Sequence, residues 1–243
     1  MEIHNFLKPE NLEYILGAFQ GDKVWSDSPL TGNIDNPKFK NNKEYIGPCL
    51  EDIVRKVRED LDSNIPWRQY IVAPQASSSP LILKYGVNDH YEEHADIGKG
   101  QFDVSLHFTN VLFLSDPNDY EGGEHNVDIY GTMKPHKLPL NTLLTYPTGR
   151  RHSVNPLTKG TRYVITWWTC SAITDPVDRE TLRNLNLILQ KVQKYLYDDL
   201  KVGFKEGARH PLGRCMVDIS RMADTIHAKY PRPRPAECPL LTE

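Results

Sequence analysis

The sequence lacks the features that mark membrane, secreted and zinc-finger proteins. It has no run of about 18 apolar residues, so a membrane-spanning helix is not expected. Its N-terminus has no basic start, unbroken apolar stretch or small-residue cleavage site, so we expect a cytoplasmic protein. Four cysteines occur without a CxxC pair, which predicts reduced and buried thiols at Cys49, Cys170, Cys215 and Cys238.

The sequence also lacks a strong charge of either sign. Lys and Arg number 29 against 32 Asp and Glu, which gives a net charge of −3. A chain so close to neutral is expected to bind neither nucleic acid nor a membrane surface. Its 243 residues, 39% of them hydrophobic, fit one large globular domain with helical flanks. Nine histidines leave metal chemistry as a function to examine.

Two helices are predicted in the N-terminal part of the chain. Apolar residues spaced three and four apart predict helices over residues 9–20 and 45–62, with Gly47-Pro48 as an alternative start for the second. The polar, turn-rich stretch 26–42 between them is expected to be a loop.

Short segments rich in β-branched and aromatic residues follow, separated by Gly, Pro and Asn turn signals. At least seven strands with no helix between them indicate an antiparallel sandwich or jelly roll. This predicts a β core over residues 67–172, with helical support in 1–66 and a C-terminal region in 173–243. The expected strands are RQYIVAP (68–74), LILKY (81–85), VSLHFTNVLFL (104–114), HNVDIY (125–130), TMKPHKL (132–138), TLLTYP (142–147) and RYVITWWTC (162–170).

Helices return in the C-terminal region. Asp175 and Pro176 are suited to begin a helix over 175–199, and a shorter helix is expected over 216–229. The apolar stripe over 182–196 is expected to pack on the sheet, and the alternative is a homodimer seam. The proline-rich tail is expected to be extended. Leu182, Leu185, Leu189, Val192 and Leu196 form the stripe.

A His-x-Asp pair is the first sign of chemistry. Side chains two residues apart in an extended chain point the same way, so His94 and Asp96 can bind one metal ion. A catalytic metal needs a third ligand, and His152, which follows the strand TLLTYP, is the candidate. Two imidazoles and one carboxylate form a facial triad, which leaves three positions open and is typical of non-haem Fe(II) oxygenases.

An arginine is expected to enter the same pocket. The turn signal at 155–160, if centred on Leu157, places Arg162 opposite His152 on a hairpin, with both side chains on one side. A guanidinium there can bind a carboxylate through two hydrogen bonds. Residues 88–96 carry acidic and no basic side chains, and residues 149–162 carry the reverse.

These segments, taken together and in order, resemble the 2-oxoglutarate- and Fe(II)-dependent dioxygenases. The similarity covers roughly residues 6–190 and is greatest to the prolyl/lysyl-hydroxylase-like branch, especially the PKHD-type hydroxylases. The segments concerned are Thr31-Gly32, Lys40-Asn41-Asn42, Tyr85-Gly86, His94-Ala95-Asp96, LFLSDPNDYEGGE (112–124) and KLPLNTLLTYPTGRRHSVNPLTKGTR (137–162).

The resemblance implies a double-stranded β-helix, which is a jelly-roll, cupin-like barrel. It implies Fe(II) bound by His94, Asp96 and His152, and 2-oxoglutarate with its far carboxylate on Arg162. It also implies O2 as a reactant and ascorbate as a reductant. Tyr85 takes the place of a tyrosine that hydrogen-bonds the cosubstrate, and the alternative is a partly buried strand residue.

Two more residues are expected to line the pocket. Trp168 lies six residues after Arg162, so it shares its sheet face, although a plain core role explains it equally well. Thr109, on the strand VSLHFTNVLFL, is expected to line the same cavity. That strand departs from the family pattern, and the region beyond residue 200 has no recognisable counterpart, so the substrate stays open.

The expected function is hydroxylation of an amino-acid side chain, free or in a peptide, with release of succinate and CO2. Asp96 favours hydroxylation, because related halogenases replace this carboxylate with a small residue. The alternatives are a non-catalytic jelly-roll binding module and a cupin-type metal oxygenase that does not use 2-oxoglutarate.

Overall fold

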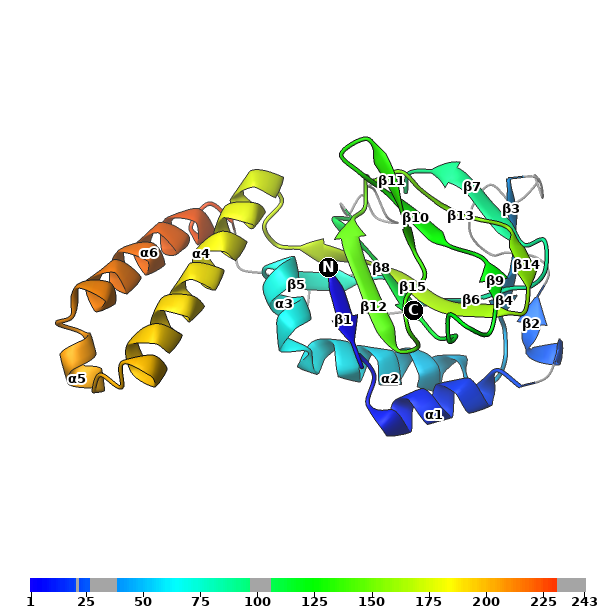
Figure 1. The fold of residues 1–243 in the computed structure, drawn as a ribbon, viewed down its shortest axis with the longest axis horizontal. Coiled ribbons are helices and arrows are strands. Elements are labelled where there is room, and N and C mark those ends of the chain that lie inside the picture. The colour runs from blue at the N-terminus through cyan, green and yellow to red at the C-terminus, as the bar shows by residue number, and fades with distance from the viewer. Residues whose placement is uncertain (21, 27–38, 97–105, 231–243) are drawn as a thin grey trace. The chain divides into compact units, whose positions relative to one another are not determined.

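The described chain forms two compact units, and its ribbon is drawn in Figure 1. This computed structural model describes residues 1–20, 22–26, 39–96 and 106–230. Of the described residues, the first unit contains those in 1–67 and 76–170, and the second contains 68–75 and 171–230. The finer segmentation at 66/67 and 172/173 stays a prediction.

Antiparallel strands build the first unit. In the described residues, an eight-stranded sheet runs in the order β1-β12-β8-β15-β6-β4-β2, with β5 added beside β15, and a five-stranded sheet runs in the order β11-β10-β13-β7-β3. Strands β14 and β9 form a separate pair. The strands are β1 (Glu2–His4), β2 (Trp25–Ser26), β3 (Lys40–Asn41), β4 (Lys43–Tyr45), β5 (Pro74–Ser77), β6 (Leu81–Tyr85), β7 (His90–His94), β8 (Phe108–Phe113), β9 (Glu121–Gly122), β10 (His125–Ile129), β11 (Thr132–His136), β12 (Thr142–Pro147), β13 (His152–Val154), β14 (Leu157–Lys159) and β15 (Arg162–Ser171).

The two sheets enclose a shared core. Leu83, Val111, Leu144 and Val164 come from the larger sheet and pack with residues such as Val154 from the smaller one. On β15 the inner positions alternate with outer ones, as expected for a strand between a core and a helical layer. The prediction of a mainly β fold with flanking helices is therefore confirmed.

Helices cover the outer face of the larger sheet. Helices α1 (Pro9–Ala18) and α2 (Leu50–Ser63) lie beneath this sheet in Figure 1. Phe19, which ends α1, stacks on Tyr163 of β15 with ring centroids 5.2 Å apart. These helices leave the inner face of the sheet free to form a site.

Three N-terminal predictions need correction. The second helix begins at Leu50 and not at residue 45, because residues 43–45 form strand β4. Residues 40–41 of the predicted loop form strand β3. The predicted strand 68–74 is mostly helical, since α3 spans Ile65–Ile71. Its start is capped by the Asn64 side chain, which accepts a hydrogen bond from the Trp67 amide at 2.9 Å.

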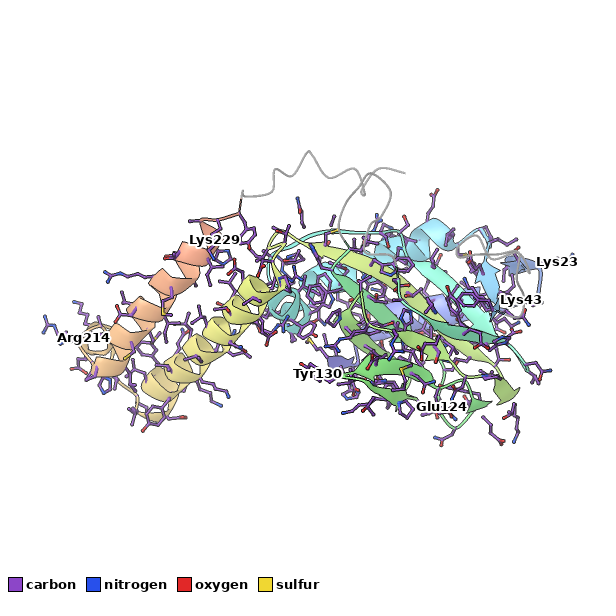
Figure 2. The ribbon with its side chains drawn as sticks, turned by 90° about the horizontal axis from the view of Figure 1, so that it is seen from above. Lys23, Lys43, Glu124, Tyr130, Arg214 and Lys229 are labelled. Atoms are coloured by element: carbon purple, nitrogen blue, oxygen red, sulfur yellow. The ribbon has the colours of Figure 1, made fainter. Side chains whose placement is uncertain are left out.

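The second unit is built on helices. It contains α4 (Pro176–Lys194), a π-helical turn (η3, Tyr195–Asp199), α5 (Phe204–Gly207) and α6 (Pro211–His227). The Asp175 carboxylate caps α4 as predicted, accepting two backbone hydrogen bonds of 2.8 Å. Helix α6 begins five residues before the predicted start at 216, with Pro211 in its first turn. Figure 2 labels Arg214 in its first turn and Lys229 just beyond its last residue.

The leucine stripe of α4 packs within the chain. Leu182 and Leu185 are buried against Ile219, Ala223 and Ile226 of α6. The first part of the stripe therefore packs on a helix of the same unit, whereas the sequence predicted packing on the sheet. Because Leu182 and Leu185 are buried in this way, the first turns of α4 are not exposed for a homodimer interface.

The remaining sequence expectations concern cysteines and membranes. Cys170 is buried, Cys49 is half-buried, and Cys215 is exposed, so the prediction of a buried thiol is wrong at Cys215. Cys238 and most of the proline-rich tail lie outside the described residues. Among the described helices, none combines the length and apolar character needed to cross a membrane.

A buried amide is predicted to hold the outer layer of the barrel together. Asn110 accepts hydrogen bonds from Trp67 at 3.0 Å and Thr145 at 2.8 Å, and donates one to Thr169 at 3.0 Å. Asn110→Leu leaves these buried partners without a hydrogen bond and without water to replace it. We therefore expect the free energy of unfolding, measured by urea denaturation, to fall by roughly 2–4 kcal/mol. The control Asn184→Leu, on the exposed face of α4, should change it by less than about 0.5 kcal/mol. Equal losses would contradict this role.

Candidate active site

A cavity of about 610 Å³ lies between the two sheets of the first unit. All seven residues predicted to form the site line it: His94, Asp96, His152, Arg162, Tyr85, Thr109 and Trp168. Both sheets contribute to the lining, so segments far apart in the sequence meet at one place. A cavity of this size can hold a small cosubstrate and part of a second molecule.

Strand pairing places two of the histidines together. Strand β7 pairs with β13 so that His94 lies opposite His152, with ring centroids 4.2 Å apart. The register then shifts, because Val154 pairs with Tyr91. Between these two pairs, β7 contains one residue more than β13. Such a β-bulge re-aims side chains, and here Tyr91 stacks on the His94 ring at 3.7 Å.

Three side chains form a metal-binding cluster at this point. The His94 Nε2 and His152 Nε2 atoms each lie 3.8 Å from Asp96 Oδ1. Their ligand atoms all lie within 4.8 Å of one another, close enough to bind a single ion. The donor set of two imidazoles and one carboxylate suits Fe(II) and leaves further coordination positions open.

Backbone carbonyls fix the orientation of both histidines. His94 Nδ1 donates to the Glu92 carbonyl at 2.8 Å, and His152 Nδ1 donates to the Arg150 carbonyl at 3.0 Å. Because a carbonyl only accepts, each Nδ1 carries the proton and each Nε2 offers a lone pair to a metal. Burial, together with the neighbouring His152, lowers the pKa of His94 to about 4, so its ring is neutral at physiological pH.

The third ligand is held by the opposite sheet. Asp96 Oδ2 accepts hydrogen bonds from the Thr109 hydroxyl at 2.9 Å and the Trp168 indole N–H at 2.8 Å. Oδ1 is the oxygen that faces the two histidines. The structure therefore places Thr109 and Trp168 next to the metal carboxylate, a more specific position than the cavity-lining one that the sequence suggested.

A buried cation lies in the same cavity. Arg162 is 1% exposed, and its guanidinium lies 5.2 Å from the ring centroids of both Tyr85 and Phe113. None of its three nitrogens has a hydrogen-bond partner among the described residues. The Tyr120 hydroxyl lies beside the guanidinium without meeting full hydrogen-bond geometry; burial raises the pKa of Tyr120, and its interaction with Arg162 acts against this rise. Such unpartnered buried donors indicate a binding site for an anion.

Two glycines make room for this arginine. Gly122 and Gly123 have φ angles of +74° and +67°, which glycine adopts readily. A Cβ on Gly123 would lie 2.3 Å from the Leu157 side chain and 3.3 Å from Arg162 Cδ. The Gly-Gly turn therefore allows the chain to pack tightly behind the guanidinium.

The predicted hairpin between His152 and Arg162 is wrong. Arg162 pairs with Tyr85 in the larger sheet, and His152 pairs with His94 and Val127 in the smaller one. Residues 157–159 form strand β14, which pairs with β9 and connects the two sheets. Arg162 still reaches the cavity, but from the opposite wall.

Several residues that line the cavity were not predicted from the sequence. Tyr146 and His125 are both buried and share a hydrogen bond of 3.0 Å beside His152. The alternation of TLLTYP could have predicted that Tyr146 faces inward, together with Leu144. Tyr91 and Lys40 had no such signal, because a bulge and a two-residue strand place them.

Comparison with known proteins agrees with this geometry. Residues 80–170 match the model of the 2OG-Fe(II) oxygenase superfamily. A PKHD-type hydroxylase of Gloeothece citriformis is 33% identical over 183 residues, which cover 74% of this chain and 81% of the relative. Another, from Pseudomonas fluorescens, is 29% identical over 227 residues, which cover 86% of this chain and 100% of the relative.

The chain belongs to the PKHD-type hydroxylases of the 2OG-Fe(II) oxygenase superfamily. This PKHD-type hydroxylase is therefore an Fe(II)- and 2-oxoglutarate-dependent enzyme, with His94, Asp96 and His152 as its iron-binding facial triad. Membership confirms the predicted family. It also sets aside the two alternatives, a non-catalytic binding module and a cupin-type oxygenase without 2-oxoglutarate.

Solved structures confirm the predicted fold of this PKHD-type hydroxylase. A Trichoplax adhaerens prolyl hydroxylase, in complex with a hypoxia inducible factor peptide fragment, superposes with a TM-score of 0.55 at 19% identity, over 70% of this chain and 82% of that one. A Pseudomonas putida prolyl-4-hydroxylase gives 0.52 at 14% identity, over 70% and 91%. The barrel is the double-stranded β-helix of these oxygenases.

Trp168 is predicted to orient the metal carboxylate. Trp168→Phe keeps a ring but removes the N–H that binds Asp96 Oδ2, so iron affinity should fall roughly 10- to 100-fold in a chelator competition assay. Trp167→Phe is the matched control, because the Trp167 indole N–H has no partner among the described residues. Equal iron affinities for the two variants would show that the Trp168 hydrogen bond does not orient the ligand.

Proposed function

We propose that this enzyme hydroxylates an amino-acid side chain, with Arg162 binding the far carboxylate of 2-oxoglutarate. The observation that supports this most strongly is the buried Arg162 guanidinium, which shares the metal cavity and has no described partner. A planar guanidinium fits a carboxylate through two parallel hydrogen bonds. The unpartnered Tyr120 hydroxyl and the cavity-lining Tyr85 add hydrogen-bonding groups beside it.

The charges of the cavity favour a dianion as cosubstrate. Among the described residues in and beside the cavity, Arg162 and Lys40 are positive, and Asp96 and Glu44 are negative, so these charges cancel. Bound Fe(II) would add two positive charges to this cavity. A dicarboxylate such as 2-oxoglutarate restores neutrality, which a monoanion or a neutral ligand does not.

The protein residues position the reagents. His94 and His152 present Nε2 lone pairs, and Thr109 and Trp168 hold Asp96 so that Oδ1 faces them. Fe(II), when bound, supplies the oxygen chemistry that protein side chains lack. In the overall reaction O2 is split: one oxygen atom enters the substrate C–H bond as a hydroxyl, and the other enters 2-oxoglutarate, which leaves as succinate and CO2.

An amino-acid side chain is the proposed substrate, free or in a peptide. Support comes from the family name of the relatives and from a fold neighbour that is a prolyl hydroxylase in complex with a peptide fragment. We further propose ascorbate as a reductant and the cytoplasm as the location. A homodimer would need a surface other than the buried Leu182 and Leu185.

Turnover of 2-oxoglutarate tests the proposed reaction. With Fe(II) under air, the wild-type protein should convert 2-oxoglutarate to succinate, detected by mass spectrometry. Asp96→Ala removes the only carboxylate of the triad, so both iron binding and succinate formation should fall by at least about 100-fold. Asp128→Ala, on the β10 strand, is the control and should keep both. Full activity in the Asp96 variant would contradict the metal site.

The role of Arg162 is tested by the affinity for 2-oxoglutarate. Arg162→Lys keeps the charge and loses the planar fork, so the KM for 2-oxoglutarate should rise roughly 10-fold, and Arg162→Gln should raise it more than about 30-fold. Arg55→Lys, on the exposed surface of α2, should leave this KM unchanged. An unchanged KM in folded Arg162 variants, with folding checked by thermal melting, would overturn the anchor.

A further inference from the structure

A second buried cation lines the catalytic cavity next to the metal ligands. The Lys40 side chain is 5% exposed, although lysine is almost never fully buried without a charged partner. Glu44 is one such partner of Lys40; its side chain is 4% exposed, and its Oε1 lies 3.7 Å from the Lys40 Nζ. Burial lowers the pKa of Lys40, while Glu44 and then Asp96 act against this shift. The ion pair with Glu44 places an ammonium group inside the cavity.

Strand register fixes Lys40 beside the metal site. Lys40 on β3 pairs with Tyr91 on β7, and the ammonium lies 5.2 Å from the Tyr91 ring. Tyr91 in turn stacks on His94, and Phe39 meets both rings edge-on at 5.6 and 6.1 Å. The smaller sheet thus presents a cation, an aromatic wall and a metal ligand on neighbouring strands about 4.8 Å apart.

This part of the cavity is separate from the place assigned to the cosubstrate. Arg162 belongs to the larger sheet, where it pairs with Tyr85, while Lys40 lies at the edge of the smaller sheet. A cosubstrate that extends from the metal to Arg162 leaves Lys40, Phe39 and Tyr91 on the opposite wall. An ammonium carries three donors and can bind a substrate acceptor while it faces Glu44.

We propose that Lys40 binds the α-carboxylate of a free amino acid, whose apolar atoms pack on Phe39 and Tyr91. Lys40 on β3 and the metal ligand His94 on β7 lie on neighbouring strands, so they are close together. An amino acid whose α-carboxylate binds Lys40 therefore has its side-chain carbons near the metal, and a small molecule is long enough to reach both. A residue inside a peptide chain has no free α-carboxylate, because that group is part of the next peptide bond. The inference rests on the proposed function and narrows its substrate to the free form.

Charge balance supports an amino acid over other small acids. The cavity charges already cancel when Fe(II) and a dicarboxylate are bound. A zwitterionic amino acid carries no net charge, so it binds without changing this charge balance. A simple monocarboxylate adds one uncompensated negative charge and is expected to bind less tightly.

Binding to an inert metal form tests the proposal without turnover. The protein is loaded with Mn(II) and 2-oxoglutarate under argon and titrated by calorimetry with the standard L-α-amino acids and their primary amides. At least one free amino acid should bind, and its amide should bind roughly 10- to 100-fold more weakly. Under air with Fe(II), the same amino acid should gain one oxygen atom.

Two lysine variants assign this preference to Lys40. In Lys40→Met the difference in affinity between acid and amide should shrink to about twofold or less, while Lys134→Met, on the exposed face of β11, should keep the full difference. Lys40→Arg retains a cation, so it should keep part of the difference in affinity between acid and amide. Thermal melting establishes that each variant is folded, and the acid-to-amide comparison in the wild type needs no variant.

Three results would overturn the proposal. These are equal binding of acid and amide by the wild type, an undiminished preference in folded Lys40→Met, and absence of binding by every free amino acid. In each case, continued conversion of 2-oxoglutarate to succinate by the wild type would leave the proposed function standing. Loss of that conversion would instead refute the proposed function itself.

Discussion

The pairing of β7 with β13 sets the position of both metal-binding histidines, on which the rest of the site depends. It brings His94 opposite His152 across two strands that lie far apart in the sequence, and its bulge turns Tyr91 onto the same wall. A slip of one residue would send these side chains to the other face of the sheet. The carbonyls of Glu92 and Arg150 then fix both rings with Nε2 towards the metal.

Each of the two sheets contributes different groups to the site around His94 and His152. The smaller sheet carries both histidines and Lys40, while the larger one carries Arg162 and the two donors that hold Asp96. Among the described residues in and beside the cavity, Arg162 and Lys40 balance Asp96 and Glu44, so the metal and its cosubstrate determine whether this part of the loaded cavity is neutral. Fe(II) and a dicarboxylate therefore need one another in this space, which couples their binding.

Sequence reasoning predicted the parts of the site that depend on local spacing. His94 and Asp96 follow the two-residue period of an extended chain, and β-rich segments without helices indicated the barrel. It failed where long-range pairing decides. The turn after Asn155 suggested a hairpin, but β14 pairs with β9, so Arg162 enters from the other sheet. Lys40 was noted only within the family-like segment Lys40-Asn41-Asn42, because a two-residue strand carries no periodic signal that would place its side chain in the cavity.

The central claim is that one cavity holds 2-oxoglutarate between a metal ion at the His-Asp-His triad and the guanidinium of Arg162. The most direct test measures the dissociation constant of 2-oxoglutarate by calorimetry under argon, with and without Mn(II). The account predicts one binding site per chain and an affinity at least about tenfold higher with the metal, because both ends of the ligand are then held. Equal affinity in the two forms would contradict it.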